Sequence, residues 1–102
     1  MPDKKLEEII NRILQVVLPD KIILFGSRAK NLAEKDSDYD IMVIKSNIDS
    51  EWKLEAKIYR NFIGLGVAVD VIVTTPEKLE QHKESLGYIY KQVLKEGITV
   101  YG

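Results

Sequence analysis

The chain contains no cysteine, and that absence removes several kinds of chemistry at once. Without thiols there can be no disulfide, no thiolate zinc site and no cysteine nucleophile. A sequence without cysteine is also compatible with a reducing compartment, and we therefore expect a cytoplasmic location.

An excess of one charge and long apolar runs are missing as well. Fifteen basic residues stand against sixteen acidic ones, so we expect no extended nucleic-acid-binding surface. Apolar runs such as residues 22–25 and 67–69 are far too short to cross a bilayer. The charged start of the chain has no signal-peptide core. We expect no membrane partner.

The remaining composition is that of a folded protein. The 102 residues are 45% apolar and 30% charged, a balance typical of globular proteins. A chain of this size can form one core without disulfide or metal support. We expect a single domain over residues 1–102.

The hydrophobic pattern predicts short strands separated by amphipathic helices. The predicted helices cover residues 4–17, 51–62, a stretch opening at 75–77, and 86–94, with a further short helix over 27–33. The predicted strands cover residues 21–25, 38–44, 68–74 and 98–101. This order indicates an α+β fold, an α/β sandwich with a mixed sheet of about four strands and helices packed mainly on one face.

A first candidate site is the glycine-serine turn at the end of the first strand. Gly26 allows the backbone to approach a ligand, and a helix starting at Ser27 would offer unpaired N–H donors to a phosphate. Arg28 and Lys30 add positive charge nearby. Such turns are common and usually only structural, and the Walker A pattern is absent here.

A second candidate is Asp38-Tyr39-Asp40 at the mouth of the next strand. Side chains two residues apart on a strand project from the same face, so both carboxylates would meet one site. Their mutual repulsion is relieved by a divalent cation, and oxygen ligands suit magnesium. Considered in isolation, an Asp-x-Asp pair is more often a solvated strand end.

The third candidate is Asp70, which interrupts the apolar strand around 67–73. A carboxylate buried there needs a partner or a metal. A salt bridge to a packed helix is the structural alternative. Strand alternation nevertheless places Asp70 on a face that must also display Asp38 and Asp40, which favours one three-acid site.

Together, Gly26-Ser27, Asp38-x-Asp40 and Asp70 resemble the motif of the DNA polymerase β-like nucleotidyltransferase superfamily. The sequence from Gly26 to Lys30, followed by 37–41, is similar to that of the minimal nucleotidyltransferases (MNT), and the resemblance covers nearly the whole chain. Two positions depart from the family's usual Gly-Ser-Arg-Ala-Arg-Gly: Lys30 replaces an arginine and Asn31 a glycine.

The resemblance implies an activity and residue roles. Proteins of this kind are the antitoxins of prokaryotic two-gene modules whose partner is a HEPN-type toxin. The implied reaction moves AMP from ATP, the nucleoside triphosphate donor, to a tyrosine hydroxyl of that toxin. Asp38, Asp40 and Asp70 would be the catalytic and metal-binding residues for two Mg²⁺ ions. Gly26, Ser27, Arg28 and Lys30 would bind the nucleotide.

The size of the chain adds one expectation about the acceptor. With no second domain in the sequence to bind an acceptor, recognition would come from the partner, in a hetero-oligomer with the toxin. Two alternatives remain open: an antitoxin that only occludes its partner, and a nucleotidyltransferase that acts on a small molecule.

Overall fold

The computed structural model describes residues 3–30, 38–82 and 88–102. Its framework is one four-stranded sheet in the order β3 (Val69–Thr74), β2 (Tyr39–Ile44), β1 (Lys21–Phe25) and β4 (Ile98–Tyr101). β1 is antiparallel to both β2 and β4, whereas β2 and β3 are parallel. The predicted mixed α+β sheet of four strands is therefore confirmed.

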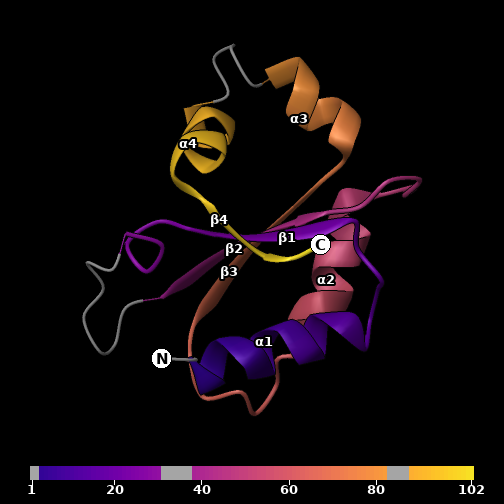
Figure 1. Ribbon diagram of the computed structural model, residues 1–102. Coiled ribbons are helices and arrows are strands. Elements are labelled where there is room, and N and C mark those ends of the chain that lie inside the picture. Colours follow the sequence, from indigo (N-terminus) through magenta and orange to yellow (C-terminus); the bar gives the residue numbers. More distant parts are fainter. Residues whose placement is uncertain (1–2, 31–37, 83–87) are drawn as a thin grey trace.

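The elements follow one another in a simple order (Figure 1). They are α1 (Lys4–Leu14), β1 (Lys21–Phe25), β2 (Tyr39–Ile44), α2 (Glu51–Arg60), β3 (Val69–Thr74), α3 (Pro76–His82), α4 (Tyr88–Glu96) and β4 (Ile98–Tyr101). Among these described helices, none combines the length and the apolar composition that a membrane span requires.

The larger core lies between the sheet and the pair α1 and α2. Fully buried Ile9 and Ile13 of α1 and Ile58 of α2 pack against alternate strand residues. These strand residues are Ile22, Leu24, Tyr39, Ile41, Val43, Val69, Val71 and Val73. Strand side chains alternate between faces, so this set fixes which strand residues project to the other side of the sheet.

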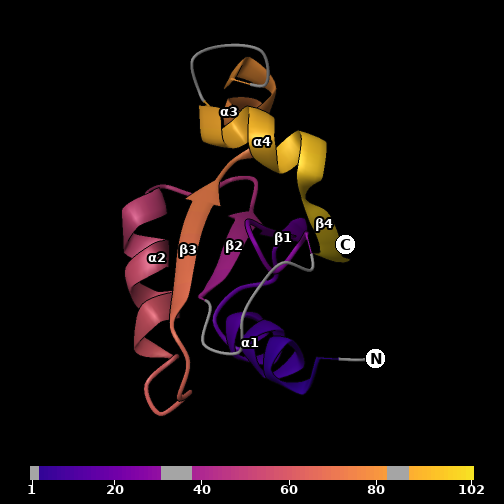
Figure 2. The same ribbon diagram turned by 90° about the vertical axis from the view of Figure 1, so that its left-hand side faces the viewer.

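That other side carries a smaller core beneath α3 and α4. Val93 of α4 packs with Ile23, Phe25, Met42 and Ile44, and Leu79 of α3 joins them. Figure 2 shows α3 and α4 on the opposite side of the sheet from α1. The expectation that the helices pack mainly on one face is wrong in this respect. Both faces of β1 and β2 are apolar, and each face therefore needs a cover.

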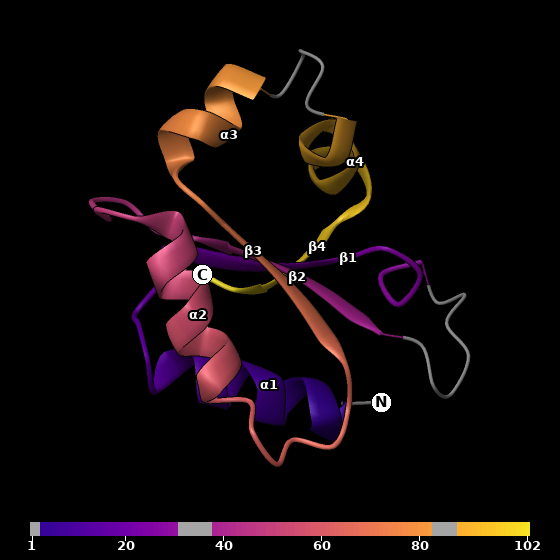
Figure 3. The same cartoon turned by 180° about the vertical axis from the view of Figure 1, so that it is seen from behind.

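α2 lies along one edge of the sheet, the strand β3 (Figure 3). Its Tyr59 hydroxyl accepts a hydrogen bond from the Val71 amide at 2.7 Å, and Glu55 Oε2 accepts one from the Val73 amide at 3.4 Å. These side chains satisfy backbone groups that an edge strand leaves unpaired.

Candidate active site

The strand register brings two of the three predicted acids together. β2 and β3 run parallel with Asp40 directly opposite Asp70, and neighbouring strands lie about 4.8 Å apart. Phe25 of β1 is the antiparallel partner of Asp40 on its other side. A row of Phe25, Asp40 and Asp70 therefore crosses three strands on the face that also carries α3 and α4.

Asp38 lies just before β2 and is exposed. The pKa of Asp40 is raised above its ordinary value, first by partial burial and then by the negative charges of Asp70 and Asp38. The three carboxylates therefore lie within electrostatic reach of one another. Asp70 is exposed, unlike the buried carboxylate that the sequence suggested, because β3 is an edge strand.

Gly26 lies directly against the Asp40 carboxylate. A Cβ built on Gly26 would overlap Asp40 Oδ2, and the Gly26 φ of +74° is one that side-chain-bearing residues rarely adopt. Both the space and the backbone conformation therefore require glycine here. The turn that the sequence assigned to phosphate binding and the acids assigned to metal binding are adjacent.

The chain after Gly26 forms a turn rather than the beginning of the predicted helix. The amides of Ala29 and Lys30 donate to the Gly26 carbonyl oxygen at 3.2 and 3.4 Å, and residues 27–30 form no helix. The prediction of a helix over residues 27–33 is therefore wrong for residues 27–30. Residues 31–33 lie outside the part of the chain that the structure describes. Ser27 is exposed beside Gly26, so its side chain is open to solvent, and no helix dipole lies behind this turn.

The two cations of this turn each have a protein partner. The Arg28 guanidinium lies 3.9 Å from the centroid of the Tyr39 ring. Lys30 Nζ forms an ion pair with Glu96 Oε2 of α4 at 2.7 Å. Because Tyr39 belongs to the α1 face, Arg28 is engaged on the side of the sheet opposite Asp40 and Asp70.

Tyr39 is the residue whose importance the sequence did not indicate. It is only 3% exposed, and its hydroxyl donates to Asp3 Oδ2 at 2.8 Å. Asp3 is the N-cap of α1, because its other side-chain oxygen accepts hydrogen bonds from the Lys5 and Leu6 amides. Burial raises the pKa of Tyr39, and the bond to the Asp3 carboxylate raises it further.

The pKa of Asp3 shifts the other way. Burial alone would raise the pKa, but hydrogen bonds from the Leu6 amide, the Tyr39 hydroxyl and the Lys5 amide, together with the Arg28 charge, lower it overall. These contacts therefore favour the ionised form of the Asp3 carboxylate. A sequence signal for this contact was hardly available, because the two partners are 36 positions apart.

The acids fit a magnesium ion in chemistry, although they do not enclose one. Within residues 3–30, 38–82 and 88–102, no group of three or more histidine, cysteine or carboxylate side chains is placed to hold a metal ion by itself. Mg²⁺ commonly binds one or two carboxylates and completes its shell with water and substrate phosphates. The paired carboxylates of Asp40 and Asp70 beside the Gly26 turn fit a site of that kind.

An apolar cavity of about 310 Å³ lies elsewhere, at the Lys21 end of β1, and is lined by Ile23, Ile44, Leu79 and Leu94 among others. The acids are at the opposite end of β1, where Phe25 faces Asp40. The carboxylates and the glycine turn therefore define the candidate site, and this cavity does not.

Comparison with known proteins gives the family. The model of the nucleotidyltransferase domain matches residues 3–100. No curated protein matches the chain.

Several solved structures share the fold. A toxin-antitoxin structure with AMP-PNP is 26% identical, with a TM-score of 0.61 over 94% of this chain and 73% of the other. A chain in the complex of tri-AMPylated Shewanella oneidensis HEPN toxin with MNT antitoxin is 21% identical, with a TM-score of 0.60 over 97% and 71%. A protein of Sulfolobus solfataricus assigned to the nucleotidyltransferases is 18% identical, with a TM-score of 0.64 over 94% and 76%.

The family match spans nearly the whole chain, including the turn and all three aspartates. The mixed four-stranded sheet with its helices matches the fold of these structures. This chain belongs to the nucleotidyltransferase domain family.

Proposed function

We propose that residues 1–102 act as one minimal nucleotidyltransferase that transfers AMP from ATP to a tyrosine hydroxyl of a HEPN-type toxin. The chain would thereby serve as the antitoxin, in a cytoplasmic hetero-oligomer with that toxin. One observation carries the proposal: Asp40 lies opposite Asp70 and against Gly26. Two acids and the Gly26-Ser27 turn thus lie at the same end of three neighbouring strands.

Asp38, Asp40 and Asp70 would hold the Mg²⁺, and the set has enough oxygens for two ions. Bound there, the metal would neutralise charge that develops on the triphosphate during in-line transfer. The protein's own contribution is to present ionised carboxylates in fixed positions, so that little reorganisation accompanies the reaction.

The remaining residues orient the reactants. Gly26 and Ser27 would bind the β and γ phosphates through the turn. The acceptor oxygen attacks the α phosphorus, the bond to pyrophosphate breaks, and the hydroxyl proton passes to Asp70. Arg28 and Lys30 would add positive potential near the phosphates, although each already has a protein partner.

The partner is proposed from the likeness to chains of toxin-antitoxin structures, one with AMP-PNP and another whose toxin is AMPylated.

The test is transfer of label from α-labelled ATP, in the presence of Mg²⁺, to a co-expressed HEPN-type toxin. We expect strong labelling of the toxin and little labelling of this chain alone. The variant Asp38→Asn with Asp40→Asn should lose labelling and neutralisation. A matched control, Asp49→Asn with Glu77→Gln, makes the same charge change at exposed positions.

Two results would favour other functions. If the double aspartate variant neutralises the toxin as fully as the wild type, occlusion explains the antitoxin effect. If the wild type labels an aminoglycoside as well as it labels the toxin, the acceptor is a small molecule. Either result contradicts the proposed transfer to a protein tyrosine as the antitoxin mechanism.

A further inference from the structure

Tyr39 is the first residue of β2 and stands between Asp38, which precedes the strand, and Asp40. Side chains alternate along a strand, so Tyr39 and Asp40 project to opposite faces of the sheet. Its ring is buried in the larger core. Any rotation of the strand about its axis at this position would turn Asp38 and Asp40 together, so whatever fixes Tyr39 also fixes the acids.

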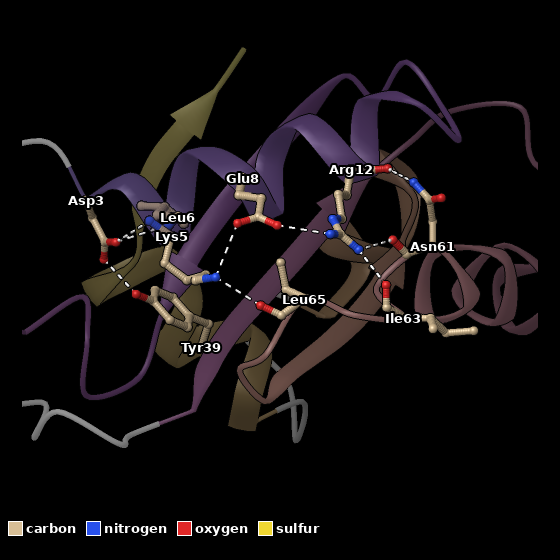
Figure 4. A network of polar contacts seen from close by, with 9 residues as sticks. All are labelled: Asp3, Lys5, Leu6, Glu8, Arg12, Tyr39, Asn61, Ile63 and Leu65. Atoms are coloured by element: carbon tan, nitrogen blue, oxygen red, sulfur yellow. Dashed lines mark hydrogen bonds and ion pairs between the residues drawn. The ribbon is translucent and has the colours of Figure 1, made fainter.

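The tip of Tyr39 is fixed to the N-terminus of α1 (Figure 4). Its hydroxyl donates to Asp3 Oδ2 at 2.8 Å, while Asp3 Oδ1 accepts from the amides of Lys5 and Leu6 at 3.0 and 3.1 Å. The same carboxylate thus caps the helix and holds the tyrosine. Phenylalanine would fill the same space but could not make this bond.

The helix to which Tyr39 is attached is itself fastened to the fold. Lys5 Nζ donates to the Leu65 carbonyl oxygen at 2.9 Å, and Arg12 Nη1 donates to that of Ile63 at 2.8 Å. Glu8 lies between them and forms ion pairs with both cations. Asp3 is therefore a rigid anchor for Tyr39 rather than a residue in a free tail.

The ring of Tyr39 also contacts the other half of the site. The Arg28 guanidinium lies 3.9 Å from the ring centroid, and Arg28 follows Gly26 and Ser27 by only two and one positions. Tyr39 thus contacts the residue that follows the Gly26-Ser27 turn, and it also lies within the Asp38-x-Asp40 segment. Gly26 in turn lies against Asp40.

From these contacts we propose that Tyr39 is a positioning residue. Held by Asp3 at its hydroxyl and by Arg28 at its ring, it sets the direction of the Asp38 and Asp40 carboxylates relative to the Gly26-Ser27 turn. This inference rests on the proposed function, because it concerns the uptake of magnesium and a triphosphate at that site.

Tyr39→Phe tests the proposal, measured by calorimetry with MgCl₂ and AMP-PNP well below the unfolding temperature. We expect the affinity for magnesium-AMP-PNP to fall by about tenfold. This is the lower limit of the loss that follows when a residue that orients metal ligands is removed. The magnesium concentration for half-maximal labelling should rise while the fold is retained.

Two further comparisons separate positioning from general loss of stability. Asn61→Ala removes hydrogen bonds from Asn61 to the Arg12 carbonyl oxygen and to Gln15, at the far end of α1, and should lower stability without changing binding. Asp3→Asn keeps a cap and a group that can bond Tyr39, so it should bind nearly as the wild type does, whereas Asp3→Ala should resemble Tyr39→Phe.

The outcomes are distinguishable. If the wild type takes up no magnesium-AMP-PNP, the proposed function fails at its first step. If it binds and Tyr39→Phe binds equally well, only the positioning role of Tyr39 is overturned. Equal weakening in Asn61→Ala would also overturn it. Should Tyr39→Phe fail to fold, equal binding by Asp3→Ala and Asp3→Asn would contradict the proposal, and a difference between them would support it.

Discussion

Gly26 determines the shape of the candidate site more directly than any other single residue. It joins β1 to the turn with a φ of +74°, and its missing side chain leaves the space that the Asp40 carboxylate occupies. Gly64 provides a natural comparison, since its φ of +83° is similar but nothing lies within 4 Å of a Cβ built there.

Gly26→Ala should therefore destabilise the protein more than Gly64→Ala. Backbone strain alone costs about 1–2 kcal/mol in either variant, and the clash with Asp40 adds to it only at Gly26. Urea unfolding measures the two losses, and calorimetry should show weaker magnesium-nucleotide binding for Gly26→Ala alone. Equal losses in both properties would mean that Asp40 moves aside freely.

Asp40 illustrates a conflict between stability and function at one residue. Its pKa is raised by partial burial and by the charges of Asp70 and Asp38. A raised pKa in the folded state means that protonated Asp40 favours folding below the ordinary aspartate pKa. This contribution is lost as the pH rises through the folded-state pKa. At neutral pH the ionised group therefore opposes folding.

Asp40→Asn should consequently stabilise the protein without metal at pH 7, by no more than about 1 kcal/mol because water screens the partly exposed group. The gain should shrink as the pH falls through the raised folded-state pKa of Asp40 and be gone below about pH 4, near the ordinary aspartate pKa. It should also shrink when Mg²⁺ is added at pH 7. Thermal unfolding across this range measures it. A variant that is less stable at pH 7 would contradict the repulsion argument.

At the scale of elements, the basic residues of α1 organise the end of α2. Arg12 donates to the carbonyl oxygens of Asn61 and Ile63 at 3.2 and 2.8 Å, in the turn that follows α2. Both carbonyls lie beyond Arg60, the last residue of α2. The turn leads into β3, so the contact helps to fix the strand that carries Asp70.

Arg12→Met should lower the free energy of unfolding by about 1–3 kcal/mol, the usual range for a charged donor that leaves its acceptors unpaired. Lys57→Met is the matched control, because Lys57 is exposed on α2 and should change stability by less than about 0.5 kcal/mol. Chemical denaturation of both variants gives the comparison. If the two losses are equal, these hydrogen bonds contribute little.

At the scale of the whole molecule, the two faces of the sheet differ in cohesion. α1 and α2 pack on the larger core with several fully buried side chains, whereas α3 and α4 depend on a smaller core around Val93 and Leu79. The candidate site lies on the face with the smaller core. Local opening is easiest where few buried contacts hold an element.

Amide hydrogen exchange under native conditions should reflect this difference. We expect amides of α4 to exchange at least about tenfold faster than those of β1 and β2, corresponding to an opening free energy about 1.4 kcal/mol lower. Mass spectrometry of peptides from each element measures it. Equal protection of α4 and the central strands would show that the two cores open as one unit.

The amino-acid sequence by itself determined the local features of this protein. Apolar periodicity located the four helices and the four strands of the structure. The two-residue period placed Asp38 and Asp40 on one side of their strand. Each of these follows from neighbours along the chain, because helix and strand periodicities are local properties.

Only the tertiary structure decided which of these features meet. The parallel pairing of β2 with β3 puts Asp70 opposite Asp40, and the edge position of β3 leaves Asp70 exposed rather than buried. Packing divides the helices between both faces of the sheet, and it gives Tyr39 its partner in Asp3. Periodicity assigns a residue to a face, whereas its neighbours on that face depend on strand order and on contacts between distant segments.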